Sequence, residues 1–140
     1  MTWPILAALS AVFAALTAIL GKIGVQGIDV NLAVAIRTSV VVVFAWGLVL
    51  LQRNGVAMPP LPARAWLFLV LSGLATGLSW LFYYRALQLG PASRVAPVDK
   101  LSVALTILLA FVFLGEPPTV GSIVGGLLIT AGALVVVFVR

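Results

Sequence analysis

The sequence predicts an all-α polytopic membrane protein with five transmembrane helices. Of its 140 residues, 64% are hydrophobic and only 8% are charged, whereas a soluble domain carries about 25% charged residues. Apolar runs such as residues 40–43 and 134–139 are continuous, which excludes the alternating strands of a membrane β-barrel. In lipid, the backbone polar groups must be satisfied within each segment, so each run is expected to form a helix.

Glycine, proline and polar residues separate five apolar segments, each close to the roughly 20 residues that a span requires. The breaks lie at residues 21–29, 52–62, 90–91 and 115–118, where these residues end or start helices. Glu116, directly before Pro117, is expected to cap the fifth helix. Because every linker is short, consecutive helices run antiparallel. The expected helices span about residues 3–21, 31–52, 65–85, 94–115 and 119–139, within one domain over residues 1–140.

The basic residues predict an orientation in the bilayer. Lys22, Arg85, Arg94 and Arg140 fall on one face, against Arg53 and Arg64 on the other. By the positive-inside rule, this bias places the N-terminus outside and the C-terminus inside. Because the bias is small, insertion in both orientations stays open. In a membrane protein, a net charge of +5 indicates how the chain is oriented in the bilayer before it indicates binding to nucleic acid. We therefore expect no nucleic-acid partner.

The chain contains no cysteine and no histidine. This excludes disulfides, the usual thiolate and imidazole metal sites, and catalysis by either residue. The sequence also has no phosphate-binding loop, metal-ligand cluster or pair of nucleophile and base. We therefore expect no enzyme activity, no metal and no cofactor.

Hydroxyl groups recur along one face of the third helix. Ser72, Thr76, Ser79 and Tyr83 are spaced i, i+4, i+7 and i+11, which places them on a single stripe. Either they line a polar pathway or they join neighbouring helices through hydrogen bonds of about 0.6 kcal/mol each. Four glycines at small-xxx-small spacing are expected to pack against other helices instead: Gly73, Gly77, Gly121 and Gly125.

The fourth helix carries the most informative polar residues. Pro97 cannot donate to the carbonyl of Ser93, so we expect a kink there. Asp99, which shares a face with Ser102, costs at least about 2.5 kcal/mol inside a membrane and therefore needs a partner or water. The candidate partners are Arg37, Arg85, Arg94 and Lys100.

Two interpretations of these charges stay open. Asp99 either belongs to a solute pathway or forms an ion pair that holds helices together. Arg37 lies six residues beyond Asn31, where its side chain could also snorkel to the membrane surface.

Several of these segments resemble the EamA domain of the drug/metabolite transporter superfamily. The resemblance is carried by residues 83–90 (YYRALQLG), 91–102 (PASRVAPVDKLS) and 114–117 (LGEP). Residues 21–24 and 35–38 resemble the first half of the same domain, so the likeness covers essentially the whole chain. Most relatives carry two such five-helix units as an inverted repeat and export amino acids or other metabolites. With one EamA-like unit, this chain is similar to the five-span bacterial and archaeal branch.

The resemblance implies a transporter in a bacterial or archaeal inner membrane that exports small polar metabolites such as amino acids. Alternating access normally requires two repeats around a midplane site, so we expect a homodimer, parallel or antiparallel. The excess of basic residues favours zwitterionic or anionic solutes. Ser72, Thr76, Ser79, Tyr83, Asp99 and Ser102 would line the pathway, and Arg37, Arg85 and Lys100 would balance Asp99 or bind a solute carboxylate. The alternatives are a subunit of a heteromeric transporter or lipid-headgroup flippase, and a non-transporting membrane structural protein.

Overall fold

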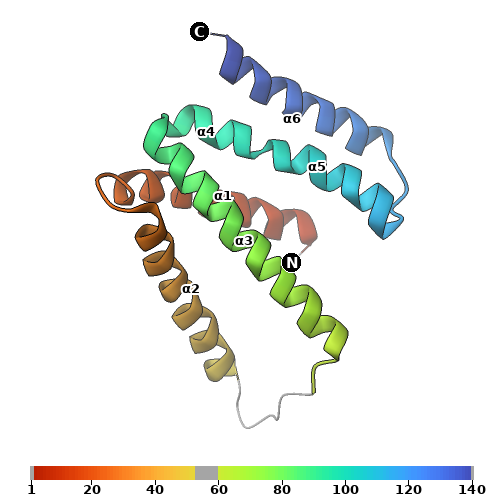
Figure 1. Cartoon of the computed structure of the whole chain (residues 1–140). Coiled ribbons are helices and arrows are strands. Elements are labelled where there is room, and N and C mark those ends of the chain that lie inside the picture. The colour runs from red at the N-terminus through yellow and green to blue at the C-terminus, as the bar shows by residue number, and fades with distance from the viewer. Residues whose placement is uncertain (1, 53–59, 140) are drawn as a thin grey trace. The chain divides into compact units, whose positions relative to one another are not determined.

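The computed structural model describes residues 2–52 and 60–139; Arg53 and Arg140, used above for orientation, lie outside this part of the chain. In the described residues all regular structure is helical, and five helices are long and apolar enough to cross a membrane (Figure 1). The predicted five-helix, all-α membrane fold is thus confirmed. The helices are α1 (Trp3–Gly24), α2 (Val30–Gln52), α3 (Ala63–Leu89), the span Ala92–Leu114, and α6 (Val120–Phe138).

α1 and α3 end where the sequence offers a specific break. α1 continues through Gly21 and Gly24, and the chain turns at Gly27, whose φ of 75° lies in the left-handed region that favours glycine. α3 extends to Leu89, beyond the expected end at residue 85, because the helix stops only at Gly90 and Pro91.

The fourth span consists of α4 (Ala92–Asp99), α5 (Leu101–Leu109) and a π-helical turn, η1 (Ala110–Leu114). Pro97 lies inside α4, and the α-helical pattern is interrupted three residues later at Lys100. The Lys100 N–H donates to both Ala96 O (3.3 Å) and Pro97 O (3.1 Å), a shared pattern typical of a locally tightened helix end. The span ends at Gly115, which has a φ of 67°.

The cap of α6 differs from the expectation for Glu116. Thr119 occupies the N-cap position, and its hydroxyl accepts from the Ser122 N–H at 3.1 Å while the Thr119 N–H donates to Ser122 Oγ at 3.2 Å. This reciprocal pair is a capping box. The expected cap at Glu116 was wrong, because the two prolines after it keep the chain extended until Thr119.

Helices pack into two compact units, the first formed by residues 1–20 with 89–140 and the second by residues 21–88. In the first unit, α6 runs back along α4 and α5 (Figure 1). Gly126 is buried in this contact, and a Cβ added there would lie 3.3 Å from Ile107 Cδ1. A residue without a side chain therefore lets α5 and α6 approach closely.

In the second unit, α2 and α3 approach each other at one end and separate toward Gln52 and Ala63 (Figure 1). The buried side chains of this unit gather at the closed end, where the α1–α2 turn meets the end of α3: Val25, Val30, Ala33, Val34, Tyr84 and Leu87. Most other large apolar side chains of the unit are exposed, as expected for helices that are covered by lipid.

The close contact at Gly126 predicts a stability difference between two neighbouring glycines. Gly126→Leu should lower the free energy of unfolding by about 1–3 kcal/mol, because the added side chain overlaps Ile107. Gly125→Leu is the matched control, since a Cβ at Gly125 meets nothing within 4 Å. Thermal unfolding of both variants in detergent measures the difference. Equal loss in the two would show that Gly125 is also packed, against a surface outside this chain.

Candidate functional site

Side-chain hydrogen bonds tie the end of α1 and the α1–α2 turn to the end of α3. The Lys22 ammonium donates to the carbonyl oxygen of Leu87. The Gln88 amide donates to Val25 O at 2.9 Å and to Ile28 O at 2.8 Å. Because the last four carbonyls of a helix lack partners within it, and a cation is favourable there, the Lys22 contact stabilises the end of α3.

Arg85 supports this junction. Its Nη1 donates to Gln88 Oε1 at 3.2 Å, so the amide oxygen is already occupied and the amide NH₂ is directed to the two turn carbonyls. Arg85 was expected to balance Asp99 or bind a solute. The structure shows it bonded to the side chain that locks the turn, and its role toward Asp99 or a solute stays a prediction.

Arg37 reaches from α2 to two aromatic rings of α3. Its guanidinium carbon lies 3.7 Å from the centre of the Trp80 ring and 5.5 Å from that of Tyr84. Tyr84 is in turn packed on Gly21, where an added Cβ would approach its ring and hydroxyl to 3.3 Å. A cation over an aromatic face contributes about 0.5–1 kcal/mol when exposed and about 2 or more when desolvated. Arg37 is therefore fixed by aromatic faces on the neighbouring helix.

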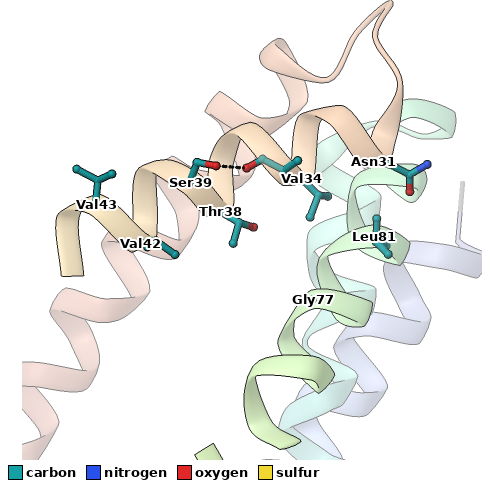
Figure 2. Close-up of a pocket in the computed structure, with 9 residues that line it drawn as sticks. Asn31, Val34, Thr38, Ser39, Val42, Val43, Gly77 and Leu81 are labelled. Atoms are coloured by element: carbon teal, nitrogen blue, oxygen red, sulfur yellow. Dashed lines mark hydrogen bonds between the residues drawn. The ribbon is translucent and has the colours of Figure 1, made fainter. Parts of the chain in front are cut away.

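A pocket of about 680 Å³ lies between α2 and α3 in the same unit. Its lining on α2 follows helical spacing, so one face of that helix forms a wall, and Gly77 and Leu81 contribute from α3. Figure 2 shows the Ser39 hydroxyl donating to the Ala35 carbonyl, at 3.0 Å. The lining residues are Asn31, Val34, Ala35, Thr38, Ser39, Val42, Val43, Gly77 and Leu81.

The Arg37–Trp80 contact lies next to this pocket in the sequence but outside its lining. Arg37 directly precedes the lining residue Thr38, and Trp80 directly precedes Leu81. At 3.6 residues per turn, Arg37 lies roughly 145° around α2 from the centre of the α2 lining residues. The contact and the pocket are therefore separate features of the α2–α3 pair.

The predicted hydroxyl stripe of α3 lies on a different face of the helix. At 3.6 residues per turn, the stripe is centred roughly 150° around the axis from Gly77 and Leu81. Ser72, Thr76 and Ser79 are exposed, and the Thr76 hydroxyl donates to Ser72 O at 2.9 Å. A pathway role for this stripe stays a prediction, and the pocket is a separate feature.

In the first unit, Asp99 is paired with its neighbour. Asp99 Oδ2 lies 3.2 Å from Lys100 Nζ, and the two side chains are 36% and 54% exposed. On the same face, the Thr106 hydroxyl donates to Ser102 O at 2.8 Å. Of the four expected partners of Asp99, the structure pairs it with Lys100.

The predicted packing glycines have open surroundings within the chain. A Cβ added at Gly73, Gly77 or Gly125 meets nothing within 4 Å, and at Gly121 it meets only Thr119 Oγ1 at 3.9 Å. The close contacts occur at Gly21 and Gly126 instead. Packing of the four glycines against other helices stays a prediction.

Sequence reasoning did not single out the polar lining of α2 or the role of Gln88. Asn31, Thr38 and Ser39 are spaced i, i+7 and i+8, a signal of one polar face in an otherwise apolar helix. The contact between Arg37 and Trp80 could not be read from spacing, because it joins residues on different helices.

These features define a multi-pass membrane protein with a pocket between two of its helices. Comparison with known proteins identifies the family. Residues 1–138 match the EamA-like transporter family, and a Sinorhizobium protein named "Uncharacterized transporter in cobO 3'region" is 47% identical over 133 residues, which cover 95% of this chain and 94% of that protein. No solved structure matches the chain significantly. The chain belongs to the EamA-like transporter family, which confirms the resemblance seen in the sequence.

The junction at Gln88 predicts a second difference in stability. Gln88→Leu should lower the free energy of unfolding by about 1–2 kcal/mol, because it removes two hydrogen bonds and leaves two carbonyls without their donor. Gln26→Leu is the control, since the exposed Gln26 amide donates locally, to Lys22 O four residues earlier at 3.2 Å. Thermal unfolding in detergent compares the two. A loss as large in Gln26→Leu would contradict the special role of Gln88.

Proposed function

We propose that this chain exports small polar metabolites, such as amino acids, across a bacterial or archaeal cell membrane as a single EamA-like transmembrane domain. Its family and the name of its Sinorhizobium relative support transport as the activity. Neither of them specifies the solute or the direction. Export and the solute class are inferred from the resemblance and from the chemistry of the helices.

The observation that carries the proposal is the pocket between α2 and α3. Its volume of about 680 Å³ lies within the roughly 300–1,000 Å³ of small-molecule sites. The pocket contains Asn31 and Thr38 in a helix whose other residues are mainly apolar. Polar groups in a membrane are costly unless they meet other polar groups, water or a ligand, so their position in a hollow supports solute binding.

We further propose that the α3 hydroxyl stripe, Asp99 and Ser102 line the rest of the route. Asp99 lies at the interruption between α4 and α5, and interrupted helices commonly form the solute and ion sites of transporters. A homodimer, parallel or antiparallel, would supply the second repeat that alternating access requires.

Replacing Asp99 separates a pathway role from a structural one. Asp99→Asn should reduce amino-acid efflux from proteoliposomes by at least about tenfold, which corresponds to roughly 1.4 kcal/mol. Because a part-exposed pair with Lys100 contributes at most about 1 kcal/mol to stability, thermal unfolding should barely change.

The matched control is Asp29→Asn. Asp29 Oδ1 accepts from the Leu32 N–H at 3.1 Å at the start of α2, a capping role that an asparagine retains. Its efflux should stay within about twofold of that of the unmodified chain. If Asp99→Asn lowers only the unfolding temperature, the charge is structural and the pathway role is wrong.

Single-cysteine labelling tests whether the hydroxyl stripe faces water. The chain has no native cysteine, and a thiol reacts with maleimide only as a thiolate, which requires water. Cysteine at Ser79 should react in intact membranes, whereas cysteine at the neighbouring exposed Leu78 should not. Labelling from the two sides also reveals orientation and any dual insertion. Equal protection at both positions would place the stripe in lipid.

A further inference from the structure

We infer that the α2/α3 pocket binds uncharged solutes that carry neutral hydrogen-bonding groups, such as amides or hydroxyls, on an apolar body. This inference rests on the proposed transport function and narrows its solutes from small polar metabolites to those without an ionised group. An amino acid, whose ammonium and carboxylate are both ionised, would bind this pocket more weakly than its neutral derivative.

The lining of the pocket favours a ligand without charge. None of the nine described residues that line it is ionisable. The nearby cations are engaged elsewhere: Arg37 lies over the Trp80 ring at 3.7 Å on another face of α2, and the Lys22 ammonium donates to the Leu87 carbonyl. An ionised ligand would therefore lose water in the pocket without gaining a counter-charge, which is costly. An uncharged ligand avoids this cost.

Two polar side chains of the lining are available for hydrogen bonds with a ligand. The third, Ser39, is already engaged, because its hydroxyl donates to the Ala35 carbonyl at 3.0 Å. Within the described residues, the side chains of Asn31 and Thr38 make no hydrogen bond. An amide and a hydroxyl can each donate and accept, and leaving such groups unpaired in a membrane is unfavourable. Both therefore suit the neutral polar groups of a solute.

The order of polar and apolar residues along α2 defines the shape of this solute. Asn31 and Thr38 are seven residues apart, roughly 10 Å along the helix axis, and both line the hollow (Figure 2). Val34 and Ala35 lie between them on the same face, and Gly77 of α3 leaves space, since a Cβ added there meets nothing within 4 Å. The lining thus matches a molecule whose apolar body lies between or beside two neutral polar groups.

Four derivatives of one amino acid test the charge requirement, because they share the same isobutyl side chain. N-acetylleucinamide is neutral, N-acetylleucine is an anion, leucinamide is a cation at about pH 6.5, below the pKa of a free α-amino group, and leucine is a zwitterion. Each tritiated compound is titrated onto the full chain in phosphatidylcholine nanodiscs, and uptake by protein-free nanodiscs is subtracted. We expect saturable binding of N-acetylleucinamide, and binding of the other three weaker by at least about tenfold.

Replacing the polar lining residues tests their contribution. Thr38→Val and Asn31→Leu preserve the approximate shape of each side chain and remove its hydrogen-bonding groups. Each should weaken N-acetylleucinamide binding by at least about threefold. Ser39→Ala is the matched control, because the Ser39 hydroxyl already donates within its own helix; binding in this variant should equal that of the unmodified chain.

Filling the hollow tests its position even if a polar variant does not fold. Gly77→Leu should weaken N-acetylleucinamide binding by at least about tenfold, because the added side chain occupies the pocket. Gly73→Leu is the matched control. A Cβ at Gly73 also meets nothing within 4 Å, but Gly73 lies outside the lining one helical turn earlier, and a helical side chain leans toward the N-terminus, away from Gly77. Its binding should be unchanged.

The outcomes separate this inference from the proposed function. Equal binding of leucine or of a singly charged derivative would overturn the uncharged solute class. Unchanged binding in Thr38→Val, Asn31→Leu or Gly77→Leu would overturn the site. Saturable binding of none of the four compounds would do the same, and loss of a dimer in Gly77→Leu would then assign the groove to a second copy of the chain. Leucine efflux from proteoliposomes without N-acetylleucinamide binding would overturn the site and leave export intact. Binding that depends on Thr38, with no efflux of any metabolite, would uphold the site and overturn export.

Discussion

The constraint on which this structure depends is that hydrocarbon offers no hydrogen bonds. Every polar group in a span must find its partner within the protein, in water or in a ligand. Several hydroxyls meet this demand inside their own helix: those of Thr76, Thr106 and Thr130 each donate to the carbonyl four residues earlier. Such groups can face lipid without a pathway. The informative polar groups are those that reach beyond their own helix.

Three such side chains lie together at one end of the second unit. Lys22 joins the end of α1 to α3, Gln88 joins the α1–α2 turn to the end of α3, and Arg37 joins α2 to Trp80 of α3. These contacts hold α2 and α3 close at this end, while the helices separate toward Gln52 and Ala63 (Figure 1). The hollow follows from this geometry, because two straight helices fixed at one end and separated at the other leave space between them.

The fold could be predicted from the sequence because the demand for internal hydrogen bonds acts on each apolar segment separately. The site was less predictable, because it depends on which faces of different helices meet. The stripe from Ser72 to Tyr83 has regular spacing, yet the pocket forms on the face of Gly77 and Leu81. Spacing alone could not choose between these faces. The cap predicted at Glu116 was wrong for a local reason: the true cap, Thr119, follows two prolines that delay the start of the helix.

The segments that identify the family and the residues that line the pocket differ in position and in role. Within the family-like segment 83–90, Arg85 orients Gln88, which locks the turn. Residues 91–102 contain the interruption at Lys100. These residues determine helix geometry. Most of the lining belongs to α2 outside those segments, so its side chains can change without disturbing the junction. A common scaffold can therefore carry pockets of different chemistry; Arg37, which lies within the family-like stretch 35–38, belongs to the contact between α2 and α3 and not to the lining.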